Sequence, residues 1–150
     1  MNFFEKMKFG KFLKSLTIGK IDTLNGVEFE DFISDLFNYL GFKTSKTAYT
    51  GDNGIDILVR FGNNSIGIQT KLYYNRNVGN KAIQEVFSGK NFYKLSYAIA
   101  CSNSNFSTPA ANLAKELKVG IIDRKILIQI LKNSRKENTK LIKELISRLI

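Results

Sequence analysis

An acid, an amide and an ammonium group lie in two short neighbouring stretches of this chain. Asp56 ends a glycine-rich turn, and Gln69 and Lys71 stand two positions apart a little further on. Residues 62–65 between them have the composition of a tight turn. Carboxylate and amide oxygens suit a hard divalent cation, and a lysine beside them adds positive charge next to a phosphate. These residue types predict a site for hydrolysis of a phosphodiester bond.

The geometry expected of this site depends on the register of a hairpin. The two strand-like runs are residues 55–61 and 66–72. If Asn63 and Asn64 form a two-residue loop, Asp56 lies opposite Lys71. Side chains alternate along a strand, so Asp56, Gln69 and Lys71 then share one face. A three-residue loop would break this arrangement, so the shared face is conditional on the loop.

Gln69 is a poor second metal ligand because its oxygen carries no charge. Glu30 could supply the missing carboxylate, since it lies at the edge of the apolar face of a helix expected from Asn25. Asp52, in the turn before Asp56, is a candidate of lower rank. Glu28 follows Asn25 by three residues, which favours a capping box over a ligand.

The same residues also have simpler explanations. Asp56 could form a cross-strand ion pair with Lys71, and Gln69 could be an ordinary, partly buried amide. Asp52 suits a turn without any function, and Glu30 alone would be a surface acid. Aspartate is disfavoured inside apolar strands, which favours a functional role for Asp56.

The composition limits the chemistry. The chain has 150 residues, 43% of them hydrophobic, which predicts one folded domain with a real core. It has no histidine and one cysteine, so any metal should be oxygen-ligated Mg²⁺ or Mn²⁺, and a reducing, cytoplasmic setting is expected. The net charge of +10 indicates an anionic partner, with nucleic acid first and an acidic membrane surface second. A merely solvated, lysine-rich surface is the alternative.

The pattern of elements predicts an α/β fold. Helix and strand signals follow one another in the order α-β-β-β-α-β-α-β-α, which favours a mixed sheet with helices on both faces. We divide the chain into a basic amphipathic segment, a central domain and a basic amphipathic helix, at residues 1–25, 26–128 and 129–150. The first segment should cap the domain or contact a dimer partner, with membrane-surface binding as a minor alternative. The last should expose an apolar stripe to a partner protein.

Several motifs together carry a family resemblance. The chain resembles the Mrr-type restriction endonuclease domain of the PD-(D/E)XK nuclease superfamily over roughly residues 26–128. The segments that carry the likeness are residues 26–30, 41–42, 51–56, 68–71, 98–103, 106–107 and 110–114. The resemblance implies a restriction-endonuclease-like mixed sheet and a metal-dependent DNA endonuclease. It also implies that Asp56, Gln69 and Glu30 bind the metal and that Lys71 is the catalytic lysine.

From these observations we expect a Mg²⁺-dependent endodeoxyribonuclease that acts in restriction or phage defence. Cutting both strands needs two sites, so a homodimer is expected, with DNA and no membrane as partner. Arg76 and Lys81 are the expected nucleic-acid contacts. Two alternatives are a structure-selective nuclease resembling a Holliday-junction resolvase and a non-catalytic nucleic-acid-binding subunit of a larger complex.

Overall fold

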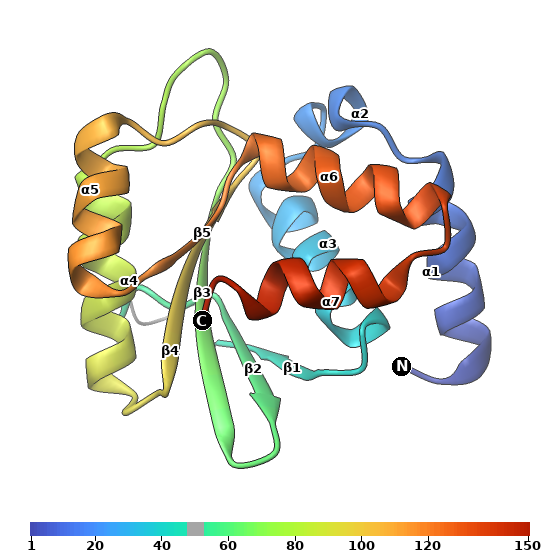
Figure 1. Cartoon of the computed structure of the whole chain (residues 1–150), viewed down its shortest axis with the longest axis horizontal. Coiled ribbons are helices and arrows are strands. Elements are labelled where there is room, and N and C mark those ends of the chain that lie inside the picture. Colours follow the sequence, from blue (N-terminus) through green and yellow to red (C-terminus); the bar gives the residue numbers. More distant parts are fainter. Residues whose placement is uncertain (48–52) are drawn as a thin grey trace.

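The fold is a mixed five-stranded sheet with helices on both faces, as the sequence predicts (Figure 1). The computed structural model describes residues 1–47 and 53–150. The strands lie in the order β1-β2-β3-β4-β5, with antiparallel pairing from β1 to β3 and parallel pairing from β3 to β5. Their bounds are β1 Lys43–Lys46, β2 Ile57–Phe61, β3 Asn64–Lys71, β4 Tyr97–Ser102 and β5 Gly120–Ile122.

The helices form two layers around this sheet. In Figure 1, α4 and α5 lie on one side of the sheet, and α3 lies on the other side together with α1, α6 and α7. Their bounds are α1 Phe3–Ser15, α2 Ile18–Asp22, α3 Gly26–Tyr39, α4 Asn80–Phe92, α5 Thr108–Leu117, α6 Arg124–Arg135 and α7 Thr139–Ser147. The expected order begins at α3, so α1, the short α2 and the division of the C-terminal tail into two helices are additions to it.

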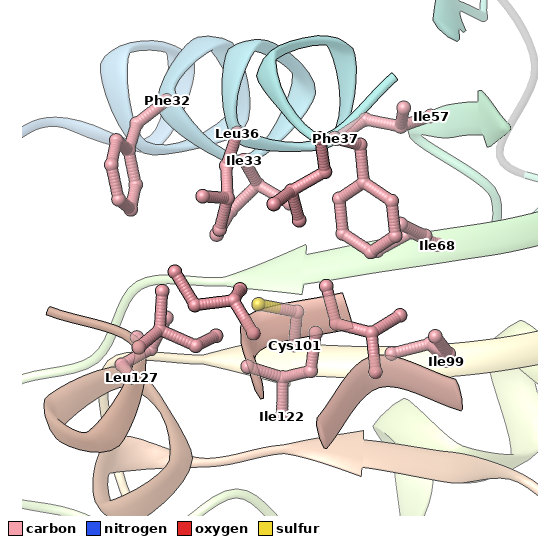
Figure 2. Packing of buried hydrophobic residues seen from close by; sticks show 14 of the residues in the cluster. Phe32, Ile33, Leu36, Phe37, Ile57, Ile68, Ile99, Cys101, Ile122 and Leu127 are labelled. Atoms are coloured by element: carbon pink, nitrogen blue, oxygen red, sulfur yellow. The ribbon is translucent and has the colours of Figure 1, made fainter. Parts of the chain in front are cut away.

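Helix α3 begins where its capping residues predict. The Asn25 side chain accepts a hydrogen bond from the Glu28 N–H, and the Glu28 carboxylate accepts one from the Asn25 N–H. The apolar face of α3 then packs onto the sheet (Figure 2), where Phe37 and Ile33 meet side chains such as Ile68. This packing places the helix that carries Glu30 beside the strands of the hairpin, as the proposed metal site requires.

The segment before Asp56 crosses α4 at very short range. Gly54 has a φ of +75°, and a Cβ there would lie 2.0 Å from the carbonyl oxygen of Glu85. A Cβ on Gly89 would likewise lie 2.0 Å from the carbonyl oxygen of Asn53. Only glycine allows two backbones to approach this closely. This contact fixes the segment just before Asp56 against α4, the helix that carries Glu85.

The register expected of the hairpin is wrong by two residues. Phe61 pairs with Asn64, so the loop is Gly62–Asn63 and not Asn63–Asn64. Gly62 has a φ of +55°, which favours glycine at the first loop position. Counting along this register brings Asp56 level with Gln69, two residues before Lys71.

The terminal segments belong to the same core as the sheet. Leu13 and Leu16 near the N-terminus and Ile142 and Ile146 in α7 are buried in the cluster that covers the α3 face of the sheet. The expectation that the C-terminal helix exposes its apolar stripe is therefore wrong, because the core of the same chain covers most of that stripe. No helix in the described residues has the length and apolar character needed to cross a bilayer.

Candidate active site

Asp56 lies at the point where the pairing of β2 with β3 ends. Its backbone N–H donates to the Ile68 carbonyl at 2.8 Å, and the named strand begins one residue later. Its Oδ2 accepts hydrogen bonds from the Thr70 N–H at 2.7 Å and from the Thr70 hydroxyl at 3.2 Å. The carboxylate of Asp56 thus accepts the hydrogen bond from the Thr70 N–H that a backbone carbonyl would accept if the strand pairing continued. This contact with β3 holds Asp56 at the end of the sheet.

Gln69 and Lys71 are brought together by an acid on α4. Glu85 Oε2 accepts a hydrogen bond from Gln69 Nε2 at 2.7 Å and lies 3.2 Å from Lys71 Nζ. Burial alone would raise the pKa of Glu85, but the hydrogen bonds from Gln69 and Lys71 outweigh burial and lower it. Glu85 is therefore a charged carboxylate at neutral pH, with two donors directed at one of its oxygens.

The amide oxygen of Gln69 is buried and unpaired within the part of the chain that the structure describes. Gln69 is 7% exposed, and no group in residues 1–47 or 53–150 donates a hydrogen bond to its Oε1. A carboxylate can only accept from the amide, so the contact with Glu85 fixes Nε2 on that side and leaves Oε1 on the other. An unpaired buried carbonyl costs about 1–3 kcal/mol, so such an atom needs an explanation. A cation bound at Oε1 would remove this cost.

Glu30 extends from α3 toward the same end of the sheet. Its pKa is raised by burial first and by the charge of Asp56 second, while Lys46 at 3.4 Å lowers it. Glu30 is therefore within electrostatic range of Asp56. Glu85 joins Gln69 to Lys71.

Of the two expected nucleic-acid contacts, Lys81 lies beside Glu85, whereas Arg76 lies in the loop after β3. Lys81, one helical turn before Glu85, has an 88% exposed side chain, and its Nζ is 3.7 Å from Glu85 Oε1. The Arg76 guanidinium carbon lies 3.9 Å from the centre of the Tyr73 ring. Arg76 also lines a polar cavity of about 530 Å³ between the loops that follow β3 and β4. Asp52, the acid of lower rank, lies outside the described residues.

Glu85 is the site residue that the sequence interpretation missed. The buried residues of α4 include Ala82, Ile83 and Val86, so Glu85 stands at the edge of the apolar face. A helix that follows a strand and leads to a parallel neighbour packs back along that strand, so its first turns lie near the strand's end. This rule would have directed attention to acids in the first two turns of α4.

The donors in this region fit a hard divalent cation with few protein ligands. Among residues 1–47 and 53–150, no three acidic or cysteine side chains gather closely enough to hold a metal by themselves. Mg²⁺ commonly takes one or two carboxylates together with substrate phosphates and waters. Asp56 and Glu30 could supply two carboxylates, and Gln69 Oε1 could supply a neutral oxygen.

Solved structures of similar fold include restriction endonucleases, each with low sequence identity to this chain. The DNA modification-dependent restriction endonuclease AspBHI has a TM-score of 0.62 and 14% identity, over 99% of this chain and 40% of its own. The small subunit of the heterodimeric restriction endonuclease R.BspD6I has a TM-score of 0.53 and 18% identity, over 96% of this chain and 87% of its own.

MspJI restriction endonuclease, solved with a 27-mer oligonucleotide, has a TM-score of 0.51 and 16% identity, and the match covers 96% of this chain but only 33% of MspJI. No curated protein matches the sequence. The family model Mrr_cat, described as restriction endonuclease, matches residues 21–131. That match covers more than half of the sequence and includes the whole cluster from Glu30 to Glu85. The chain therefore belongs to the Mrr_cat restriction endonuclease family.

Proposed function

We propose that the protein is a metal-dependent DNA endonuclease that hydrolyses phosphodiester bonds, in restriction or phage defence. The observation that carries this proposal is the Gln69 amide. Its Nε2 is fixed by Glu85, and its buried Oε1 has no hydrogen-bond partner within residues 1–47 and 53–150. Gln69 lies on the same strand as Lys71, two residues before it. Family membership supports a nuclease, and the geometry supports the choice of a hard divalent cation.

In this proposal, Asp56, Glu30 and Gln69 Oε1 hold Mg²⁺ or Mn²⁺. The cation, when bound, would polarise a phosphate oxygen and make a water molecule more acidic. Thr70 keeps Asp56 in place through two hydrogen bonds, so this carboxylate needs little reorganisation on binding. Neutralisation of the repulsion between Glu30 and Asp56 would contribute to metal affinity.

Lys71 would act on the phosphate directly. Glu85 holds its ammonium at the end of β3, and Lys71 can release that contact to approach a phosphate oxygen or the attacking water. In that position Lys71 stabilises the negative charge that grows on the phosphate oxygens in the transition state. Glu85 thus has two roles, which are to orient the Gln69 amide and to position the lysine.

DNA is the substrate that the charge favours. The net charge of +10 suits a polyanion, as do the exposed cations Lys81, beside Glu85, and Arg76, in the loop after β3. We propose a homodimer as the working form, because one site cuts one strand.

The test is incubation of the purified protein with supercoiled plasmid, with Mg²⁺, with Mn²⁺, and with EDTA. We expect nicked and linear products only with a divalent ion. Parallel reactions with linear duplex and with a four-way junction distinguish a general endonuclease from a junction-selective enzyme. Binding of DNA without cleavage under all metal conditions would favour a non-catalytic nucleic-acid-binding subunit and contradict the proposal.

A further inference from the structure

Helix α1 exposes large apolar side chains. Phe3, Phe4 and Met7 are 72%, 75% and 47% exposed, although the inner side of the same helix buries Leu13 and packs Phe9 against the core. Scattered single apolar residues on a surface are ordinary, but several on one short helix indicate a contact surface. Lys11 lies among them and makes no ion pair within the part of the chain that the structure describes.

A groove lies between α1 and α3, next to this exposed face. It has a volume of about 810 Å³, and Phe9, Phe12, Phe32 and Leu24 form its apolar lining. The same groove is lined by four acids, namely Glu5, Glu28, Asp31 and Asp35, and by two cations, Lys8 and the N-terminal ammonium of Met1. The groove is thus locally negative in a chain whose net charge is +10.

Asp31 of the groove is ion-paired with Lys46. The other three acids of the groove form no ion pair within the described residues. Glu5 and Glu28 accept backbone N–H groups in capping boxes, which does not neutralise a carboxylate. Burial raises the pKa of Asp35 most, and the charges of Asp31 and Glu5 raise it further. A basic group from a partner would relieve this repulsion.

We propose that two copies of this chain dimerise through α1, with the Phe3, Phe4 and Met7 face of each helix in the acid-lined groove of the other copy. The basis is complementarity, because the exposed face is apolar and basic while the groove is apolar and acidic. Since α1 supplies both the inserted face and one wall of the groove, a two-fold axis makes the contact twice and closes the assembly. The inference names a surface for the homodimer and does not depend on nuclease activity.

An anionic membrane is a weaker match to the same helix. Lysines and phenylalanines on one face are typical of interfacial helices. The four acids of the groove would face the same lipid headgroups and be repelled by them. A second copy of the chain fits both the cations and the acids, and so it is the partner that the observations favour.

The test is sedimentation equilibrium of the full chain at several concentrations and salt levels. We expect a monomer–dimer equilibrium that weakens with salt, because part of the contact is ionic. Phe3→Ser/Phe4→Ser should raise the dimer Kd at least about tenfold, given the apolar area removed. Phe92→Ser removes a side chain that is 66% exposed on α4 and should leave the Kd unchanged. Circular dichroism checks that each variant is folded.

Charge reversal tests the pairing across the axis. Lys11→Glu alone and Asp35→Lys alone should each weaken the dimer, because each places like charges in the contact twice. An equimolar mixture of the two variants should form a heterodimer in which both contacts are again of opposite charge. A wild-type chain that stays monomeric at about 100 μM, or a Kd that Phe3→Ser/Phe4→Ser leaves unchanged, would overturn the proposal. Binding of a monomeric chain to anionic phosphatidylserine vesicles through the same residues would also overturn it, in favour of a membrane contact.

Discussion

Replacement of Glu85 by glutamine tests whether this acid on α4 organises the end of β3. The substitution keeps the size of the side chain and removes its charge. It weakens two contacts of one oxygen, with Gln69 Nε2 at 2.7 Å and with Lys71 Nζ at 3.2 Å. A glutamine at this position can accept or donate, so it no longer dictates which end of Gln69 faces the metal.

The expected magnitude follows from these contacts. A hydrogen bond to a charged group contributes about 1.5–3 kcal/mol, and partial exposure places these two toward the lower end. If the orientation of Gln69 loses about 1.5 kcal/mol, the affinity for the cation should become roughly tenfold weaker. The loss of the contact between Glu85 and Lys71 should lower kcat, and this decrease in kcat should persist at saturating metal.

The assay pairs Mn²⁺ titration by electron paramagnetic resonance with cleavage rates at increasing Mg²⁺. We expect Glu85→Gln to bind Mn²⁺ more weakly and to recover part of its rate at high Mg²⁺. Glu116→Gln, an exposed acid on α5, serves as the matched control. Unchanged Mn²⁺ affinity together with unchanged kcat in Glu85→Gln would refute the role assigned to this residue.

Three further substitutions test the elements around the site. Gly54→Ala places a Cβ 2.0 Å from a backbone oxygen at a φ of +75° and should lower the free energy of unfolding by about 2–4 kcal/mol, whereas Gly26→Ala has open space and should be near neutral in urea unfolding. Asp22→Asn should cost about 1 kcal/mol at pH 7. The hydrogen bond from Arg124 lowers the pKa of Asp22 in the folded state. Its contribution to stability is therefore present above the ordinary aspartate pKa and is lost as the pH falls through the lowered pKa of the folded state. In urea unfolding from pH 7 down to about pH 2, the free energy of unfolding should fall less in Asp22→Asn than in wild type. Arg76→Ala should weaken DNA binding and reduce the slope of log K against log salt by about 1, as measured by fluorescence anisotropy without metal; an unchanged slope would exclude a phosphate contact at Arg76.

The parts of the fold that local rules govern could be predicted from the sequence. The capping pair Asn25 and Glu28 marks the start of α3, and the apolar spacing that follows gives its buried face. The alternation along β3 also holds, because Gln69 contacts Glu85 of α4 while its neighbour Ile68 belongs to the core on the α3 side of the sheet. Local sequence patterns were sufficient in these cases because a different helix start or a shift of one residue in the strand would break the pattern.

The register and the role of Glu85 could not be predicted, for different physical reasons. Moving the hairpin loop from Asn63–Asn64 to Gly62–Asn63 shifts the pairing by two residues, which leaves every side chain on the same face. The alternation of apolar and polar residues is therefore consistent with both registers and does not distinguish them. Glu85 acquires its role only through packing of α4 on β3, and the spacing within α4 alone marks it as a boundary residue.

The C-terminal helix shows the same limit in another form. An amphipathic stripe such as that of Ile142 and Ile146 predicts that something covers it. It does not say whether the cover is the same chain or a partner. In α7 the cover is the core of its own chain, whereas in α1 the exposed Phe3 and Phe4 still lack one within the described residues.

The proposed site is tested most directly by plasmid cleavage. The assay compares wild type with Asp56→Ala and Lys71→Ala, and it uses Lys43→Ala, at the far end of the sheet, as the control. We predict that both site variants lose cleavage in Mg²⁺ and in Mn²⁺. DNA binding and folding should be retained, and Lys43→Ala should cut like wild type. Cleavage that persists in the Asp56→Ala and Lys71→Ala proteins would contradict the assignment of the active site to this end of the sheet.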